Sequence, residues 1–314
     1  MSRIVIALGG NALQENPKDI SAEAQLVTSR NTAKSIVDIA ELGHEIILAH
    51  GNGPQVGQIV STYEAAAYNN KSIPIMPFPE CGAMSQGYIG YHLQQAIRDE
   101  MISRGLNREV AAIITQVKVN AKDPGFSNPT KPVGSFFTKD EAMVLEKEKG
   151  YVMKNDANRG YRRVVPSPIP IEVVEEKVIK TLVEAGHIVI TVGGGGIPVV
   201  DEDKSTKGIS AVIDKDFAPE KLAEILNADI LLILTAVDKV AINFGKENEK
   251  GLEEITVSEA EKYIEEGHFA PGSMLPKVKA AVKFAKFKSS NISIISSLNS
   301  AKYALEGRAG TKII

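Results

Sequence analysis

The stretch that decides the fold is IVIALGGN, residues 4–11. Its five consecutive apolar residues predict a strand buried on both faces, which is typical of a parallel sheet covered by helices. Gly9 and Gly10 follow this strand directly. Glycines at such a strand end either make a tight surface turn or let a ligand come close to the backbone. Motifs elsewhere in the chain decide between these two alternatives.

The composition narrows the class of protein. The chain has 314 residues and 43% apolar content, which is enough for one large α/β domain or two lobes. A net charge of −3 and the absence of Trp argue against a nucleic-acid or anionic-membrane partner. The single cysteine, Cys81, excludes an internal disulfide framework. With no signal-peptide pattern and no apolar run near the ~20 residues of a membrane span, we expect a soluble, cytoplasmic protein.

Short apolar runs alternate with helical patterns along the chain, and Gly43, Gly105, Gly186 and Gly267 each follow a helical pattern, as C-cap residues do. This alternation predicts a three-layer α/β/α sandwich with an open, mainly parallel central sheet. The expected strands are 4–8, 45–50, 110–117, 187–192, 209–213, 229–234 and 291–296. The expected helices lie near 20–42, 54–67, 85–104, 171–185, 217–226, 258–265, 276–287 and 299–306.

Residues 118–170 break this alternation. They are rich in Pro and Gly, contain short extended pieces, and have one helical pattern near 138–149. We interpret the segment as a small lid that protrudes from the sandwich. The alternative is a long surface loop, although structureless loops of this length are uncommon in compact domains.

Two further glycine clusters follow predicted strands: HGNGPQVG at 50–57 and TVGGGGIP at 191–198. The carboxyl ends of parallel strands lie at one edge of the sheet, so three such clusters would border one crevice. Exposed backbone N–H groups and helix N-termini favour an anion there, and phosphate above all. A Walker A loop is absent. The acidic residue that a dinucleotide fingerprint needs about 20 positions on is also missing, which disfavours a nicotinamide or flavin enzyme.

Three lysines could supply positive charge at this crevice. Lys215 lies between Asp214 and Asp216 after a predicted strand, Lys277 follows Pro276 at a predicted helix start, and Lys131 stands between two prolines in the lid. Phosphoryl transfer needs positioning and positive charge more than covalent help from the protein, so this set suits it. A cluster of surface charges is the alternative.

The sequence gives little support for a metal site or for acyl-transfer chemistry. The five histidines show no metal-ligand spacing, and no HExxH, CxxC or GxSxG motif occurs. We therefore interpret the histidines and Cys81 as structural residues.

The motifs ALGGN, HGNGPQVG, CGAMSQG, NPTKPVG, RRVVPSP, VIDKD and GSM-x-PK occur in that order. In this order the sequence resembles the carbamate kinases, a group with the amino-acid-kinase fold, over essentially its whole length. The resemblance implies reversible transfer of a phosphoryl group between ATP and carbamate, giving ADP and carbamoyl phosphate, with Mg²⁺. It also implies a homodimer and a place in arginine metabolism.

The resemblance implies roles for individual residues as well. The carbamate and phosphoryl cradle would be Gly9, Gly10, Asn11, Gly51, Asn52 and Gly53. The catalytic residues would be Lys131, Lys215, Lys277, Asp216 and Asp214. The nucleotide site would contain Gly194, Gly195, Thr235, Val237, Phe244, Met274 and Pro276. No residue is expected to ligate a metal directly. Residues 1–200, with the lid, would form the phosphoryl-side lobe, and residues 201–314 the nucleotide-side lobe.

Two positions depart from the family pattern. Ala236 stands where Asp is usual, and Leu275 replaces a Gly at which positive φ or close approach of ATP could be needed. Weakened or altered nucleotide use is therefore one hypothesis. The alternatives to an active carbamate kinase are a kinase for another small acid and a nucleotide-binding relative that has lost turnover.

Overall fold

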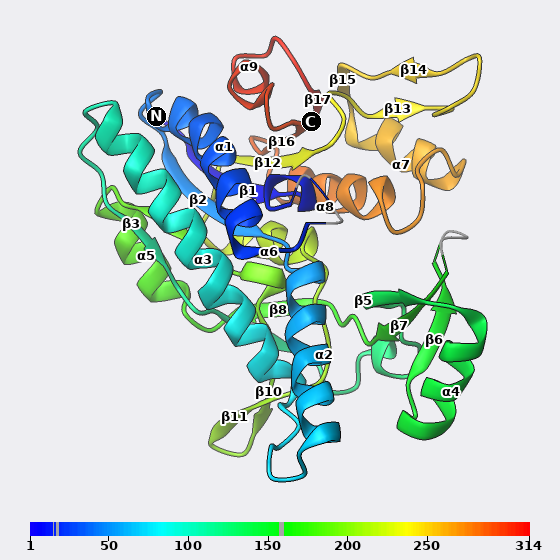
Figure 1. Cartoon of the computed structure of the whole chain (residues 1–314). Helices are drawn as coiled ribbons and strands as arrows, with labels where there is room; N and C mark the ends of the chain where they lie inside the picture. Colours follow the sequence, from blue (N-terminus) through cyan, green and yellow to red (C-terminus); the bar gives the residue numbers. More distant parts are fainter. Residues whose placement is uncertain (15, 17–18, 157–159) are drawn as a thin grey trace.

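The computed structural model describes residues 1–14, 16, 19–156 and 160–314, and an eight-stranded sheet forms its centre (Figure 1). The strand order is β15-β17-β16-β12-β1-β2-β9-β3, and every neighbouring pair is parallel except β16 with β17. The strands are β1 (Arg3–Leu8), β2 (Glu45–His50), β3 (Val110–Ala112), β9 (Ile188–Ile190), β12 (Ile230–Thr235), β15 (Glu254–Ile255), β16 (Ile292–Ser297) and β17 (Thr311–Ile313). The predicted mainly parallel sheet is confirmed.

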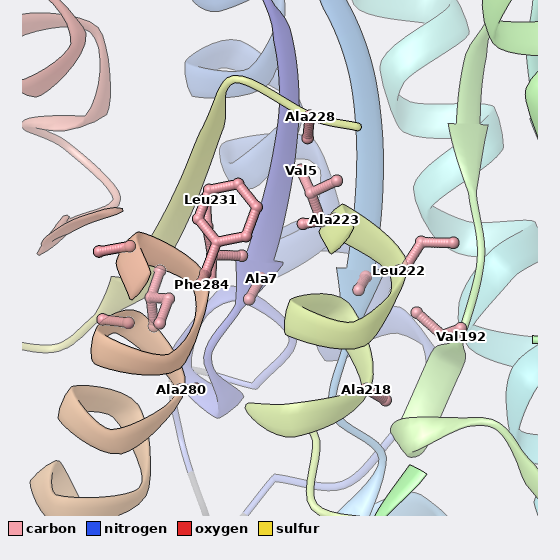
Figure 2. Close-up of a cluster of buried hydrophobic side chains, with 14 of the residues drawn as sticks. Val5, Ala7, Val192, Ala218, Leu222, Ala223, Ala228, Leu231, Ala280 and Phe284 are labelled. Carbon is pink, nitrogen blue, oxygen red and sulfur yellow. The ribbon is translucent and has the colours of Figure 1, made fainter. Parts of the chain in front are cut away.

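Successive residues of β1 pack into two different helical layers. Ile4, Ile6 and Leu8 join the cluster made with α1 (Ala22–Ala40), α3 (Phe78–Ser103) and α9 (Ala301–Leu305). Val5 and Ala7 join the cluster on the opposite face, which contains residues of α5 (Glu176–Glu184), α6 (Phe217–Ile225), α7 (Val257–Glu265) and α8 (Met274–Phe287). Figure 2 shows α6 and α8 side by side over this second face. The three-layer α/β/α sandwich is therefore confirmed.

The remaining elements differ from the sequence-based expectation in several places, and the helix expected over 85–104 begins already at Phe78. Residues 110–117 form two strands, β3 and β4 (Gln116–Val119), because the chain leaves the central sheet between them. Residues 209–213 form no strand; Ile209 and Val212 donate single backbone hydrogen bonds to Pro198 and Pro166 without a ladder. The helix expected over 171–185 begins only at Glu176, because β8 (Pro170–Val173) precedes it.

A second, four-stranded sheet was not expected. Its order is β11-β10-β4-β8, with β10 (Ile197–Glu202) parallel to β4 and the other pairs antiparallel; β11 is Ser205–Gly208. Both β3–β4 and β9–β10 pass from the central sheet into this one. The turn between β9 and β10 is η3 (Gly193–Gly195), so the GGGG cluster lies at the junction of the two sheets.

The segment between β4 and β8 folds as a separate three-stranded sheet, β5-β7-β6, with one helix. Its elements are β5 (Lys131–Phe137), α4 (Lys139–Lys149), β6 (Val152–Asn155) and β7 (Tyr161–Val165). We call residues 131–165 the lid. A capping box of Thr138 and Glu141 begins α4, and Gly150 ends it with φ of 65°. The long-loop alternative is wrong, whereas the two lobe boundaries stay a prediction.

The lid stands beside α2 (Gly53–Asn69), which lies between it and α3 (Figure 1). A hairpin of β13 (Ala241–Ile242) and β14 (Lys250–Gly251) projects near α7, and η1 (Gly10–Ala12) and η2 (Pro124–Phe126) are short 3-10 turns. The four predicted cap glycines, Gly43, Gly105, Gly186 and Gly267, have φ between 71° and 87°. Among the described helices, none combines the length and apolarity needed to cross a bilayer.

Candidate active site

The segment Asp214–Lys215–Asp216 joins the lid to the body of the molecule. Asp216 is the N-cap of α6, and its backbone N–H donates to Asp214 Oδ1 at 3.0 Å. This turn directs the two carboxylates to two different lysines. Asp214 Oδ2 accepts from Lys131 Nζ of the lid at 2.8 Å, and Asp216 accepts from Lys277 Nζ of α8 at 2.9 and 3.1 Å. The structure therefore brings all five predicted catalytic residues together.

The two ion pairs differ in burial. The side chains of Lys277 and Asp216 are 10% and 7% exposed, whereas those of Lys131 and Asp214 are 27% and 17% exposed. Burial by itself would raise the pKa of Asp214. The positive charge of Lys131 and its hydrogen bond, together with the Asp216 N–H, outweigh burial and hold that pKa below its usual value. Asp214 is therefore held as a carboxylate that orients Lys131, and Asp216 orients Lys277 through its two hydrogen bonds.

Lys215 lies against the end of β2. A Cβ atom at Gly51 would lie 2.9 Å from Lys215 Cδ and 3.4 Å from its Nζ, so only glycine leaves room for this side chain. In the part of the chain that the structure describes, no carboxylate lies within ion-pair distance of the Lys215 ammonium group. Burial, and then the positive charge of Lys277, lower the pKa of Lys215. A desolvated cation of this kind is suited to receive an anion.

Asn52 links two of the glycine clusters. Its Nδ2 donates to Ser85 Oγ on α3 at 2.8 Å, and Ser85 Oγ in turn donates to the Gly82 carbonyl at 2.7 Å. Gly194 has φ of 65°, and a Cβ there would lie 2.1 Å from Asn52 Nδ2. The side chain of Asn52 therefore packs directly on the GGGG turn, and α2 begins at the next residue, Gly53.

The GGGG turn also reaches the aspartate–lysine segment. Gly195 has φ of 93°, and its Cβ position lies 2.3 Å from the carbonyl oxygen of Ile213, the residue before Asp214. Val192, at the start of the turn, has φ of 43°, which is strained for a β-branched residue. The Val192 N–H donates to Thr115 Oγ1 at 3.1 Å, which helps to hold this conformation. Strain of this kind persists where surrounding contacts determine the backbone.

His50 ends β2 at the same edge and is buried. Burial lowers the pKa of its imidazole to about 4, so the ring is uncharged at neutral pH. Its Nδ1 lies 2.8 Å from the Gly51 carbonyl oxygen, and since a carbonyl only accepts, Nδ1 carries the hydrogen. The ring thereby fixes the peptide that supports Lys215.

The first strand ends beside β12. Gly9 N–H donates to the Leu234 carbonyl at 2.9 Å, which places the Gly9 backbone next to the strand that ends at Thr235. Gly10 starts η1, and a Cβ there would meet open space. The backbone of Asn11 is in the same turn, but its side chain lies outside the described part of the structure. The opening glycines thus lie at the sheet edge where β2 and β9 also end.

The predicted nucleotide residues lie on several elements. Thr235 ends β12, Val237 follows it, and Met274 and Pro276 are in the first turn of α8. Phe244, at the tip of the β13–β14 hairpin, is 69% exposed. Their contact with a nucleotide stays a prediction.

The two departures from the family pattern differ in their surroundings. Leu275 is the second residue of α8, and its N–H donates to the Ala270 carbonyl at 3.1 Å. Its backbone is therefore helical rather than of positive φ, and its side chain packs against the core. Ala236 is exposed in the loop after β12.

Two residues of the CGAMSQG motif received no role from the sequence. Ser85 accepts the hydrogen bond from Asn52, and Gln86 both donates to the Thr115 carbonyl at 3.0 Å and accepts from its N–H at 2.7 Å. Gln86 thereby fixes the chain where it leaves the central sheet. The motif itself was the available signal, since two polar residues at fixed positions in a buried helix require partners.

The acidic residues give no closed metal site. Within residues 1–14, 16, 19–156 and 160–314, no group of three or more His, Cys, Asp or Glu side chains is arranged to hold a metal ion. Asp214 and Asp216 each already accept hydrogen bonds from a lysine.

Known proteins resemble this chain over nearly all of its length. Residues 2–296 match the model of the amino acid kinase family. A carbamate kinase of Clostridium perfringens is 59% identical over 312 residues, 99% of each chain, and a carbamate kinase-like protein of Escherichia coli is 55% identical over 99% of this chain and 98% of its own. The carbamate kinase of Giardia lamblia bound to AMP-PNP superimposes with a TM-score of 0.91 at 44% identity, covering 100% of this chain and 98% of that one.

Proposed function

Since the chain belongs to the amino acid kinase family, and to the carbamate kinases within it, we propose that it transfers a phosphoryl group reversibly between ATP and carbamate. The observation that supports this most is the meeting of three lysines at one segment. Asp214 and Asp216, the sequence neighbours of Lys215, hold Lys131 and Lys277, and no carboxylate of the described residues forms an ion pair with Lys215 itself.

The chemistry needs cations rather than a general base. A carbamate oxygen attacks the γ-phosphorus while the bond from that phosphorus to the β–γ bridging oxygen breaks, and ADP leaves. Carbamate is already an anion, so neither change requires a proton transfer. The negative charge on the phosphoryl oxygens has to be stabilised as the group moves. Lys215, Lys277 and Lys131 are the residues that we assign to this task, with Asp216 and Asp214 orienting two of them.

The glycine clusters would form the acceptor side. Gly9, Gly10, Asn11, Gly51, Asn52 and Gly53 lie at the ends of β1 and β2, where backbone N–H groups and the N-terminus of α2 can bind a small anion. The bond from Asn52 to Ser85 and the packing of Asn52 on Gly194 hold this region rigidly. Carbamate is small enough for a cradle built mainly from backbone.

The nucleotide would lie over the C-terminal half, against Gly194, Gly195, Thr235, Val237, Phe244, Met274 and Pro276. The two site carboxylates are engaged with lysines, so Mg²⁺ would be held by the nucleotide phosphates, and Asp214 would support the lysines or the water shell of the metal. Bound there, the metal would neutralise phosphate charge.

A homodimer is part of the proposal. Met84 and Tyr91 on α3 are 36% and 59% exposed, and Ile114, 46% exposed, lies 3.9 Å from the Cβ position of Gly87 between them. Such a patch of large apolar residues is typical of a protein interface. We expect sedimentation to give twice the mass of one chain and Tyr91→Glu to shift it toward the monomer. A cytoplasmic location and a place in arginine metabolism complete the proposal.

The test is a coupled assay for ATP formation from ADP and carbamoyl phosphate. We expect turnover that requires Mg²⁺ and is lost in the double variant Lys215→Met/Lys277→Met. A preference for acetate or another small acid over carbamate would support a kinase of different substrate. ADP binding by calorimetry without any ATP formation would support the nucleotide-binding relative that has lost turnover.

A further inference from the structure

Glu64 lies on α2 about three turns after Gly53, and its carboxylate contacts three side chains of the lid. The Tyr151 hydroxyl donates to Glu64 Oε1, and Lys149 Nζ donates to Oε2 at 2.8 Å. Arg163 Nη1 lies 3.6 Å from Oε1, and the Arg163 guanidinium lies 3.8 Å from the centre of the Tyr151 ring. We call Glu64, Lys149, Tyr151 and Arg163 the Glu64 network. It joins α2 to both α4 and β7 of the lid.

A second contact between α2 and the lid is made by backbone. A Cβ atom on Gly57 would lie 2.4 Å from Gly134 Cα and 2.7 Å from Gly134 N, so α2 and β5 touch without any side chain between them. Gly134 has φ of 73°, which allows β5 to turn at this point. Lys131 is three residues away on the same strand. The position of β5 against α2 therefore determines where Lys131 lies.

The rest of the face between α2 and the lid is poorly filled. A cavity of about 860 Å³ lies there, lined among others by Gly57, Glu64, Val133, Gly134, Tyr151 and Arg163. Adjoining it, a small apolar cluster of Val56, Phe78, Cys81, Val133 and Val165 joins the lid to the body. Because so little packing holds the outer part of the lid, the polar contacts at Glu64 carry more of its attachment than a surface ion pair usually does.

We propose that Glu64 is a positioning residue for phosphoryl transfer: by holding Lys149, Tyr151 and Arg163 it keeps β5 in place and Lys131 on Asp214. This inference rests on the proposed function of Lys131. Glu64 lies about 16 Å along the helix axis from Gly53, so it acts through the lid rather than on the substrates. The same helix thus bears the acceptor cradle at one end and the lid attachment further along.

The surroundings of Tyr151 fit this role. Burial, and then the hydrogen bond to Glu64, raise the pKa of Tyr151 to about 12, so its hydroxyl remains a donor at every working pH. The Glu64 side chain is 17% exposed, which limits screening by solvent. A carboxylate that accepts two hydrogen bonds and has a guanidinium at ion-pair distance is part of a network rather than a single pair.

The experiment is a double-mutant cycle with Glu64→Gln and Lys131→Met, read as kcat and KM for ATP formation. We expect Glu64→Gln to lower kcat/KM about 5- to 30-fold in the wild-type background, the scale of a small misplacement of a reacting group. In the Lys131→Met background, Glu64→Gln should lower kcat/KM less than about twofold, because the ammonium group that Glu64 positions is absent. Glu254→Gln, which removes an exposed ion pair with Lys312 at the far edge of the central sheet, is the matched control and should have no effect.

Amide hydrogen exchange gives a readout that needs no activity. In Glu64→Gln we expect β5 and β7 to exchange faster while β1 and β12 keep their protection. Unchanged exchange in the lid would overturn the attachment itself. Equal losses in both backgrounds, with Lys131→Met impaired, would overturn only the positioning role of Glu64. A fully active Lys131→Met would instead overturn the proposed function of Lys131, and the positioning role with it.

Discussion

The body and the lid each supply one lysine to the same three-residue segment, and they hold these lysines in different ways. Lys277 stands on α8 among buried residues such as Val278, Ala280 and Ala281, and its ion pair with Asp216 is almost fully buried. Lys131 stands on the lid, with a more exposed partner. Core packing thus fixes one charge, whereas the other depends on how the lid is attached. Substitutions of the three lysines can test this distinction.

The largest effect is expected for Lys277→Met. Turnover should fall at least 10²-fold, the scale on which loss of a transition-state charge partner acts. The free energy of unfolding should also fall by about 3 kcal/mol, because the carboxylate of Asp216 is left buried without its partner. Denaturant unfolding measures this loss. Asp216→Asn added to Lys277→Met should restore much of the stability without restoring turnover, and restored turnover would refute the role of Lys277.

Lys215→Met should also reduce turnover by about 10²-fold, but with the opposite effect on stability. Lys215 is half-buried, and no carboxylate lies within ion-pair distance of its ammonium group in the described structure, so removing the charge should raise the free energy of unfolding by up to about 1 kcal/mol. A variant that is both inactive and destabilised would show that Lys215 serves the fold rather than the reaction.

The lowered pKa of Lys215 also predicts how activity depends on pH. Because the folded protein binds this proton less tightly than a free lysine does, Lys215 loses its charge at a pH below the ordinary lysine value. We expect kcat/KM to fall about tenfold per pH unit above that point. The charged form costs stability, so this cost should lessen as the pH rises through the same range. A flat kcat/KM up to pH 10.5 would contradict the assignment.

Lys131→Met should have the smallest effect of the three lysines. We expect kcat to fall about 10- to 50-fold, and the free energy of unfolding to change by less than about 1 kcal/mol, since a partly exposed pair contributes little. ADP binding by calorimetry should change less than kcat does. A loss of stability as large as that of Lys277→Met would remove the distinction between the two lysines.

The central sheet could be predicted because its strands bear a strong local signal. Residues 4–8 and 45–50 are apolar on both faces, and the structure places them as β1 and β2 with side chains in both helical layers. The second sheet was missed because β10 and β11 pair through backbone, with exposed residues such as Asp201, Lys207 and Thr206. In the run 209–213 only Ala211 and Ile213 are fully buried. Its backbone bonds to two prolines instead of joining a ladder, and no local pattern distinguishes such a run from a strand.

The candidate site was predictable as a set of residue types but not as a set of partners. The sequence shows Asp214, Lys215 and Asp216 together, yet nothing in it tells which aspartate holds Lys131 and which holds Lys277. That choice depends on the hydrogen bond from Asp216 N–H to Asp214 Oδ1, which shapes the turn, and on the position of the lid. Glu64 could not be predicted either, because a single acidic residue on a helix has no local signal until its three distant partners are known.

The place of β1 in the sheet has a consequence for how the chain folds. Val5 pairs with Ile47 on one side but with Leu231 on the other, so one edge of β1 finds its neighbour only in a segment more than 220 residues further along the chain. Contacts of such long sequence separation slow folding and leave an apolar strand edge open to wrong pairings in the meantime. We therefore expect refolding to be limited by the docking of residues 230–235 onto β1, and the nascent chain to depend on chaperones until that segment is synthesised.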